Sequence, residues 1–512
     1  MNNRHQVKLG DFSSKIKDIP CTCKGEHKDA AYQLYRTQNE HKCIVWNNCQ
    51  RTLFAAWKRH LIAGPLPEPT ALNEFLDFAY KTIEQEVGQD LDHFDYSYSQ
   101  WYNHLTYNQQ LELANVNRDN ITDKPCTYDM FCKRETQMYR EGESLPKARA
   151  IQGPQPEDKF VLGPVTWNLE DLFGKKFKGY CGGKNWDELE SQLEQNYRDG
   201  YTIILQGDGS GFDRTQTHEV KAVDRYIYSR ISKHIHHVDE EVFLRKANSR
   251  YRKIRGYIYD QGNKKKVLEA VIDGTVTSGN PDTTLMNTIR MALYIRFMAY
   301  KAGVDARFIA KGDDFAVFCK SYHDAYLIEA QIKKYWAKKD SVFNAEYGLG
   351  LVYKFVKIGD YSTFDFCSTH LLCDFPREKF KIVRQWERII EQGAYSVKAL
   401  NYTQQEVSAH VHQLVESMKT WDKDMMFYKE YRDQLLSLYP EEGKSRKIVG
   451  KTKQYLDDDG HKRRHQDELD GKPYEEIKDK LRYSSRVLDN DVVKQNFLDL
   501  YQLVPYEEPW KI

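Results

Sequence analysis

The chain has 512 residues, 40% of them hydrophobic and 13% aromatic, which argues against a disordered protein and is enough for a large globular one. Its 76 Lys and Arg residues balance 75 Asp and Glu residues to a formal net charge of +1, so any nucleic-acid groove must come from local clusters of cations. The 10 scattered cysteines favour free thiols, no apolar run is long enough to cross a bilayer, and the first five residues lack a signal-peptide pattern. We expect this part of the protein to be soluble and in a reducing compartment, which leaves room for a membrane tether on another chain.

The first 125 residues contain two predicted helices and no motif that assigns a function. Apolar residues recur at helical spacing before Gly64-Pro65 and again before Gly88, where each helix is predicted to end. The members are Trp46, Cys49, Leu53, Trp57 and Leu61 in the first helix and Leu72, Phe75, Leu76, Ala79, Ile83 and Val87 in the second.

Six potential zinc ligands also lie in this region, namely Cys21, Cys23, His27, His41, Cys43 and Cys49. Their Cys-x-Cys and His-x-Cys spacings do not match the paired knuckles of common zinc sites, so ordinary thiols and imidazoles are the favoured interpretation.

Cations gather from Lys133-Arg134 to the stretch 147–154, around a segment that resembles a strand. Most such runs are solvated basic edges. The alternative is a phosphate-binding arm, in which Arg149 supplies a two-pronged fork and Lys133 a point charge. This segment alone does not decide between the two.

A strand is predicted over 201–206, with Asp208 at its end, Asp213 just beyond and a helix through Val220, Val223, Ile227 and Ile231. A strand, an acidic turn and a helix in this order are a common setting for chemistry in folds of mixed α and β structure. The plain alternative for Asp213 is a helix cap. A hairpin turn is predicted further on, around Gln261–Lys264.

The segment 274–287 reads as a polar loop, containing Ser278-Gly279, that leads into a helix near Pro281. Leu285, Ile289, Ala292, Leu293 and Phe297 give that helix a buried face. Thr283 and Asn287 are four residues apart, so they share one face and can point into the same site. The alternative is a polar loop that merely caps a core helix.

Two apolar runs within 306–320 flank Gly312-Asp313-Asp314, which predicts a β-hairpin with carboxylates at its tip. Two like charges ~4 Å apart repel by about 4 kcal/mol at an effective dielectric near 20, and a cation removes that repulsion. Hard oxygen ligands of this type suit Mg²⁺ or Mn²⁺. An Asp-rich turn without a metal is the alternative.

After the hairpin we predict a helix through Ile328, Ile332 and Trp336, and beyond residue 374 helical cores alternate with charged stretches. The cores are Ile382, Val383, Trp386, Ile389 and Ile390, then Leu414, Val415, Met418 and Trp421. Gly443–Ser445 and Gly450–Thr452 lack the first glycine of a P-loop at the required distance, which excludes an NTPase.

The order of these motifs, over roughly residues 131–373, resembles the RNA-dependent RNA polymerases of positive-strand RNA viruses, nearest to the tombusvirus-like and nodavirus-like groups. The resemblance implies an α+β right-hand fold of fingers, palm and thumb, with an antiparallel palm sheet flanked by helices. The implied parts are an N-terminal helical extension or fingers (1–125), fingers with the basic nucleotide-binding segment (126–200), palm (201–219), a fingers insertion (220–273), palm (274–373) and a largely helical thumb (374–512).

The same resemblance implies a role for each motif residue. Asp208, Asp313 and Asp314 would hold two Mg²⁺ or Mn²⁺ ions for the transfer of NTPs to an RNA 3′ end. Lys354 would protonate pyrophosphate as general acid, with Lys357 as a rival and an exposed strand lysine as the plain alternative. Asp213 and Asn287 would recognise the ribose, in a pocket lined by Ser278, Gly279 and Thr283. Lys133 and Arg149 would bind the triphosphate. Phe366, Cys367 and Ser368 would form a primer-grip turn, with an ordinary hairpin as the alternative.

Two other functions stay open. Reverse transcriptases usually have an aromatic residue where this chain has Asp213, which ranks that activity second. An inactive polymerase-fold RNA-binding replication protein is opposed by three intact, mutually repelling acids. The implied partners are template and nascent RNA, NTPs and other viral replication proteins. The implied location is the host cytoplasm, at membrane-associated replication complexes reached through a partner or another part of the viral protein.

Overall fold

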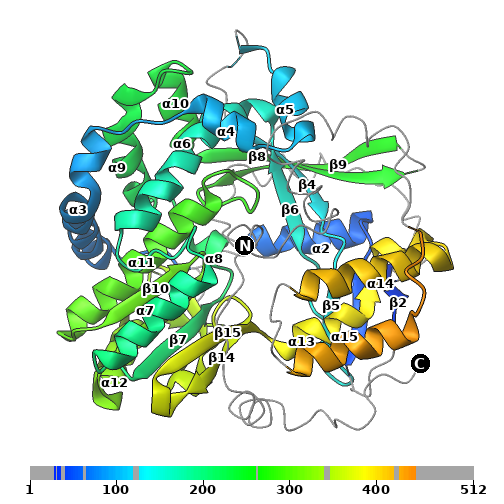
Figure 1. The fold of residues 1–512 in the computed structure, drawn as a ribbon. Helices are drawn as coiled ribbons and strands as arrows, with labels where there is room; N and C mark the ends of the chain where they lie inside the picture. The colour runs from blue at the N-terminus through cyan, green and yellow to red at the C-terminus, as the bar shows by residue number, and fades with distance from the viewer. Residues whose placement is uncertain are drawn as a thin grey trace.

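The computed structural model describes residues 28–29, 31–35, 41–61, 65–118, 121, 126–260, 263–339, 346–419 and 426–444. Helices and strands are mixed along the chain (Figure 1), which confirms the mixed α+β composition that we predicted.

The helices are α2 (Gln50–Leu61), α3 (Pro69–Asp92), α4 (Tyr98–His104), α5 (Tyr107–Ala114), α6 (Pro156–Lys176), α7 (Trp186–Arg198), α8 (Phe212–Thr215), α9 (Ala222–Ile231), α10 (Glu240–Ala247), α11 (Thr283–Ala302), α12 (Tyr322–Tyr335), α13 (Trp386–Ile389), α14 (Gln404–Lys419) and α15 (Met426–Leu438). The strands are β1 (Lys28–Asp29), β2 (Tyr32–Gln33), β3 (His41–Trp46), β4 (Thr127–Cys132), β5 (Thr136–Arg140), β6 (Ala150–Pro154), β7 (Ile203–Gly209), β8 (Tyr251–Asp260), β9 (Asn263–Asp273), β10 (Arg307–Lys311), β11 (Asp314–Cys319), β12 (Trp336–Lys338), β13 (Leu351–Gly359), β14 (Thr369–Asp374), β15 (Lys379–Arg384) and β16 (Tyr395–Ser396).

A five-stranded sheet in the order β10-β11-β7-β13-β12 lies at the centre of the site. It is antiparallel except at β12-β13. Alternate residues of β11 enter different cores: Phe315 and Val317 pack with α11 and α12, whereas Ala316 and Phe318 pack toward α7 and the β14-β15 hairpin. The strand is therefore buried on both faces, which explains its nearly continuous apolar sequence.

A second sheet of four strands, β6-β4-β8-β9, lies above the first in the view of Figure 1 and packs its apolar face on α2. Strands β8 and β9 pair Asp260 with Asn263, and residues 261–262 of the predicted turn lie outside the described residues.

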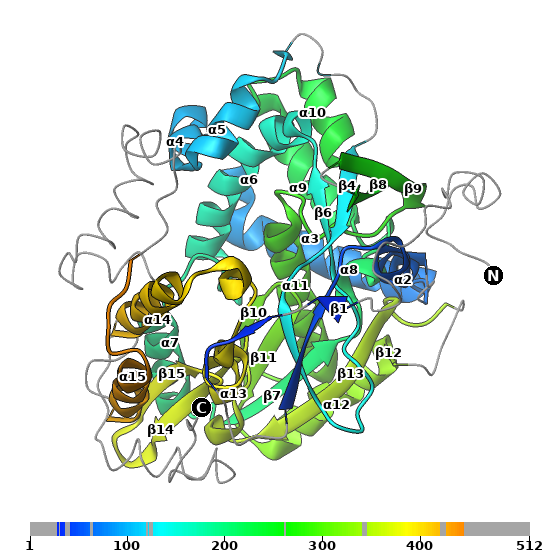
Figure 2. The ribbon, with the colours of Figure 1, turned by 90° about the vertical axis from the view of Figure 1, so that its right-hand side faces the viewer.

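The N-terminal segment joins the C-terminal helices, although they lie far apart in the sequence (Figures 1 and 2). Strand β2 pairs with β16, and the Leu34 amide donates to the Ala394 carbonyl at 2.7 Å. Leu34 and Tyr35 are buried in the core formed by α13, α14 and α15. Strand β3 pairs with β5, so the same segment also reaches the part of the chain that carries Lys133.

Several helix predictions are wrong. Trp46 ends β3, where its indole donates to the Pro146 carbonyl at 2.8 Å, and α2 begins only at Gln50. Helix α3 continues past Gly88 to Asp92, because Leu91 is fully buried and its packing outweighs the roughly 1 kcal/mol that glycine costs a helix. Trp336 opens β12 instead of ending α12.

Another error concerns Ile382 and Val383, which lie in β15 and not in a helix. A short apolar run fits either period, and here pairing with β14 decides for a strand. Leu414 and Val415 do lie in α14 as predicted, whereas Trp421 lies outside the described residues. Within the described ranges, no helix combines the length and the apolar character needed to span a membrane.

Candidate active site

The three motif aspartates meet at one end of the central sheet. Strand β7 pairs with β11 in a register that sets Gly207 opposite Phe315, so the next positions along the two strands are Asp208 and Asp314. Asp313 directly precedes Asp314, in the two-residue turn closed by the Lys311–Asp314 pair. Gly312 adopts φ 63°, a left-handed conformation that favours glycine, and its amide donates to the Thr288 hydroxyl of α11 at 2.8 Å.

The carboxylates of this cluster repel one another. Displacement of water by the surrounding protein raises the pKa of Asp313, and the nearby charge of Asp208 raises it further. Burial, with the adjacent Asp313 next, raises the pKa of Asp314 to about 6. Both shifts mean that the charged forms are disfavoured here, the condition that a cation relieves.

Lys354 of β13 supplies a positive charge at this site. Its ammonium forms an ion pair with Asp208. Strand β13 neighbours β7 on the side opposite β11, so the lysine and the Asp314 hairpin flank Asp208 from two sides. Lys357, its rival in the sequence interpretation, donates instead to the Thr363 carbonyl at 3.4 Å. The described part of the chain contains no group of three His, Cys, Asp or Glu side chains arranged to hold a metal ion.

The predicted turn at Phe366-Cys367-Ser368 borders the same cluster. Phe366 and Thr369 exchange backbone hydrogen bonds, and Cys367 and Ser368 have φ values of 52° and 60°, the signature of a tight turn of the primed type. The Cys367 thiol donates to the Asp314 carboxylate, and burial, followed by the charge of Asp314, raises the pKa of that thiol. The turn thus packs directly against the acidic hairpin.

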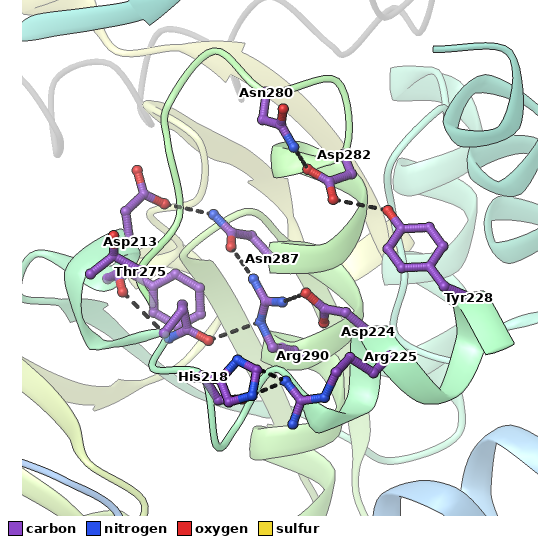
Figure 3. Close-up of polar contacts among 12 residues, drawn as sticks. Asp213, His218, Asp224, Arg225, Tyr228, Thr275, Asn280, Asp282, Asn287 and Arg290 are labelled. Atoms are coloured by element: carbon purple, nitrogen blue, oxygen red, sulfur yellow. Dashed lines mark hydrogen bonds and ion pairs between the residues drawn. The ribbon is translucent and has the colours of Figure 1, made fainter. Parts of the chain in front are cut away.

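Asp213 and Asn287, from two different helices, contact each other. Asp213 lies in α8, directly after β7, and Asn287 lies in α11, where its amide donates to Asp213 Oδ1 at 2.8 Å (Figure 3). Burial raises the pKa of Asp213, and the Asn287 hydrogen bond opposes that shift. The Asp213 side chain therefore is not a helix cap; it faces another polar side chain.

The residues that support this pair were not among those predicted from the sequence. Arg290 is fully buried in α11 and contacts Asn287, Asp224 and Gln216 (Figure 3). One signal was available in the sequence: an arginine within an apolar helical run is almost never buried unless it is paired.

The loop before α11 is anchored at several points. Tyr128 donates to Asn280 at 3.0 Å, Tyr228 donates to Asp282 at 2.9 Å, and Arg252 donates to the Thr275 carbonyl at 2.6 Å. Of the predicted pocket residues, Ser278 is exposed on this loop, whereas the Thr283 hydroxyl donates back to the Thr277 carbonyl at 2.6 Å.

Gly279 lies against β6. A Cβ at this position would lie 2.2 Å from the Gln152 carbonyl oxygen, so only glycine allows the loop to approach that strand so closely. The contact ties the loop to the segment that carries Arg149.

Lys133 and Arg149 converge on one carboxylate. Glu135 lies 2.7 Å from Lys133 Nζ and 3.4 Å from Arg149 Nη1, and the Lys133 amide donates to the Arg149 carbonyl at 2.7 Å. The Arg149 charge also lowers the pKa of Asp313, which opposes the rise due to lost water. Arg149 therefore lies near the acidic cluster, and Glu135, a residue that we did not predict, holds Lys133 beside it.

The candidate zinc ligands do not assemble in the described residues. Cys21, Cys23 and His27 lie outside them, and Cys43 and Cys49 are free thiols. His41 Nδ1 instead lies 2.7 Å from Glu391.

Comparison with known proteins assigns a family to this arrangement. Residues 207–494 match a family described as viral RNA dependent RNA polymerase. The chain is 24% identical over 329 residues to the RNA-directed RNA polymerase of Panicum mosaic virus (strain United States/Kansas 109S) and 23% identical over 265 residues to that of Groundnut rosette virus (strain MC1). These matches cover 61% and 50% of this chain but only 31% and 28% of the relatives, so the chain spans about a third of their length.

Proposed function

The chain belongs to the family of viral RNA-dependent RNA polymerases, and from this we propose that it copies an RNA template by transferring NTPs to an RNA 3′ end. One observation carries the proposal: Asp208 on β7 and the Gly312-Asp313-Asp314 hairpin meet on neighbouring strands at the end of one sheet. Nucleotidyl transfer needs positioned groups and neutralised charge more than it needs a covalent nucleophile from the protein.

Members of this family depend on divalent metal ions, and we propose Mg²⁺ or Mn²⁺ for this chain. The donor chemistry fits, because Asp208, Asp313 and Asp314 offer only hard carboxylate oxygens and the pKa values of Asp313 and Asp314 are raised. When bound, such ions would activate the 3′-hydroxyl and stabilise the charge that develops on the leaving group. The Lys354 ammonium must leave Asp208 for all three carboxylates to act as ligands.

The chain's own residues would then divide the remaining work. Lys133 and Arg149 bind the triphosphate, replacing Glu135 as their anionic partner. Lys354, once displaced from Asp208, lies in reach of the same site and donates a proton to the departing pyrophosphate. The turn of Phe366, Cys367 and Ser368 supports the primer end beside Asp314.

Sugar recognition is assigned to Asp213 and Asn287. A 2′-hydroxyl both donates and accepts, and a carboxylate beside an amide offers one partner for each role. Ser278, Gly279 and Thr283 border this pocket through the loop that precedes α11. A deoxyribose would leave the polar pair without these hydrogen bonds, which disfavours dNTPs.

We propose a right-hand arrangement for the whole chain, with β7, β10, β11 and β13 as the palm sheet. In this assignment 201–219 and 274–373 form the palm, 126–200 and 220–273 belong to the fingers, and 374–512 form the thumb, with 1–125 as an N-terminal extension or fingers. The joining of β2 to β16 and of β3 to β5 supports an N-terminal segment that links fingers and thumb.

Template RNA, nascent RNA and NTPs are the proposed ligands, with other viral replication proteins as partners in the host cytoplasm. The test is incorporation of labelled nucleotides by the purified chain on a defined RNA template, with a reaction lacking template as control. We expect template-dependent incorporation of NTPs and poor use of dNTPs. Efficient use of dNTPs would favour a reverse transcriptase, and no incorporation on any template would favour an RNA-binding protein.

A further inference from the structure

We propose that Arg290 sets the sugar selectivity of this site by fixing the orientation of the Asn287 side-chain amide. The inference rests on the proposed function, in which Asp213 and Asn287 face the ribose 2′-hydroxyl. Arg290 does not touch the substrate in this account. It is a positioning residue that acts through Asn287.

The Arg290 guanidinium uses each of its nitrogens on a different partner. Nη2 donates to Asn287 Oδ1 at 2.6 Å, Nε donates to Gln216 Oε1 at 2.9 Å, and Nη1 forms an ion pair with Asp224 (Figure 3). The side chain is completely buried, and Asp224 is 4% exposed. The planar group is therefore held from three directions and cannot rotate without breaking a buried contact.

This geometry removes an ambiguity that every asparagine has. A carboxamide can turn by about 180° and exchange its oxygen with its NH₂ group. Arginine has only donors, so the Asn287 oxygen must face Arg290. The NH₂ group must then face Asp213, where it donates to Oδ1 at 2.8 Å. Arg290 and Asp213 thus hold the two ends of the amide, and Arg290 is the fixed, buried anchor of the pair.

The fixed amide gives the pocket a defined polarity. One amide hydrogen is used on Asp213, and the second can donate to a ligand oxygen. Among the described residues, no hydrogen bond engages the other carboxylate oxygen of Asp213, which can accept a hydrogen bond from the ligand. A hydroxyl that accepts from Asn287 and donates to Asp213 satisfies both groups, and a 2′-hydrogen satisfies neither.

If Arg290 were lost, the hydrogen bond to Asp213 alone would hold the Asn287 amide. The side chain could then swing out of the position in which its second amide hydrogen faces the ligand. The ion pair with Asp224 is sufficient to neutralise the buried charge of Arg290. If Arg290 served only to stabilise the fold, its contact from Nη2 to Asn287 would not be needed.

The test is the ratio of kcat/KM for an NTP to that for the matching dNTP, measured with the full chain on an RNA template. The first variant is Arg290→Met combined with Asp224→Leu, since removing one partner of a buried pair alone leaves an uncompensated charge. The second is Arg290→Lys, which keeps a charge for Asp224 but lacks the planar fork. Arg296→Met is the matched control, because Arg296 lies on the same helix and pairs with Glu86 at 2.6 Å.

We expect the sugar ratio to fall about tenfold or more in the double variant, the size of one misplaced hydrogen bond, and by less in Arg290→Lys. The ratio of kcat/KM for an NTP with the matched base to that for one with a mismatched base should stay unchanged. A general loss of structure would lower this ratio as well. Arg296→Met should keep the native sugar ratio. In an Asn287→Ala background the Arg290 changes should cause no further fall, because both act through one group.

Asn287→Ala and Asp213→Ala distinguish the two claims. If these variants lose sugar selection and both Arg290 variants keep it, the role of Arg290 is refuted while the ribose pocket stands. An additive fall in the Asn287→Ala background would likewise refute it. If Asn287→Ala and Asp213→Ala keep the native ratio, the ribose pocket and the Arg290 proposal fail together. Should the double variant not fold, as judged by thermal melting, Arg290→Lys alone decides.

Discussion

The ammonium of Lys354 forms an ion pair with the carboxylate of Asp208, 146 residues earlier in the chain and on the adjacent strand of the central sheet. In the absence of a bound cation, this contact offsets part of the repulsion among Asp208, Asp313 and Asp314. The Lys354 ammonium therefore supplies beside Asp208 the positive charge that the proposed metal ions would supply.

Lys354→Met should lower the melting temperature in the absence of divalent ions and enlarge the rise that Mg²⁺ or Mn²⁺ produces. The reason is that the ion need no longer displace an ammonium, and a ligand that binds only the folded state stabilises it according to its affinity. Lys357→Met is the control, because its ammonium donates to the Thr363 carbonyl. Equal metal-induced shifts in both variants would contradict competition at Asp208.

Asp314→Asn should stabilise the metal-free protein near neutral pH. The pKa of Asp314 is about 6 in the folded protein, above the ordinary value of about 3.9, so the folded state holds this proton more tightly than the unfolded chain does. The stabilising contribution of the protonated group is complete below about pH 4 and is lost as the pH rises through 6. Denaturation in EDTA should find the variant more stable than the native chain at pH 7 and equally stable at pH 4. A difference that does not change with pH would refute the assignment.

Gly279→Ala should destabilise the loop before α11 and reduce nucleotide incorporation, because its Cβ would lie 2.2 Å from the Gln152 carbonyl oxygen. Overpacking of this kind typically costs about 1–3 kcal/mol. Gly153→Ala is the matched control on the facing strand, since its Cβ would approach only the Asp129 carbonyl oxygen at 3.8 Å. Chemical denaturation and incorporation rates measure both effects, and equal behaviour of the two variants would show that the close approach is unimportant.

Arg149→Met should raise the KM for NTPs about tenfold or more, since a hydrogen bond to a charged group contributes roughly 1.5–3 kcal/mol. The effect should shrink as the salt concentration rises, because the charge of the exposed Arg149 side chain is screened. Lys42→Met removes a comparable exposed cation in β3, which pairs with Glu141 at 2.7 Å, and it should leave KM unchanged. Steady-state kinetics at two salt concentrations make the comparison. A native KM in Arg149→Met would remove this residue from the triphosphate site.

Local patterns in the sequence were sufficient for much of this fold. The tight Gly312-Asp313 turn follows from glycine and aspartate between two apolar runs, and the course of α11 follows from its apolar spacing. The short apolar run at Ile382 and Val383 fits both a helix and a strand, and the predicted helix is wrong. Only the pairing of β14 with β15 distinguishes the two there.

The candidate site was less accessible from sequence, since its contacts join residues far apart in the chain. Asp213 and Asn287 were proposed as a pair only by resemblance to a family, and nothing local predicts that Arg290 reaches Asp224, 66 residues away. The same holds for Glu135, whose position between Lys133 and Arg149 depends on the return of the chain alongside Lys133.

The central claim is that acids from separate strands form one catalytic centre, and Asp313→Asn tests it most directly. The measurement is the rate of RNA-templated NTP incorporation with Mg²⁺ or Mn²⁺, beside Asp199→Asn as a surface control that lies outside the site. We predict a loss of about a hundredfold or more in Asp313→Asn, the consequence of losing several kcal/mol of charge stabilisation, and native rates in the control. Native incorporation by Asp313→Asn would contradict the account.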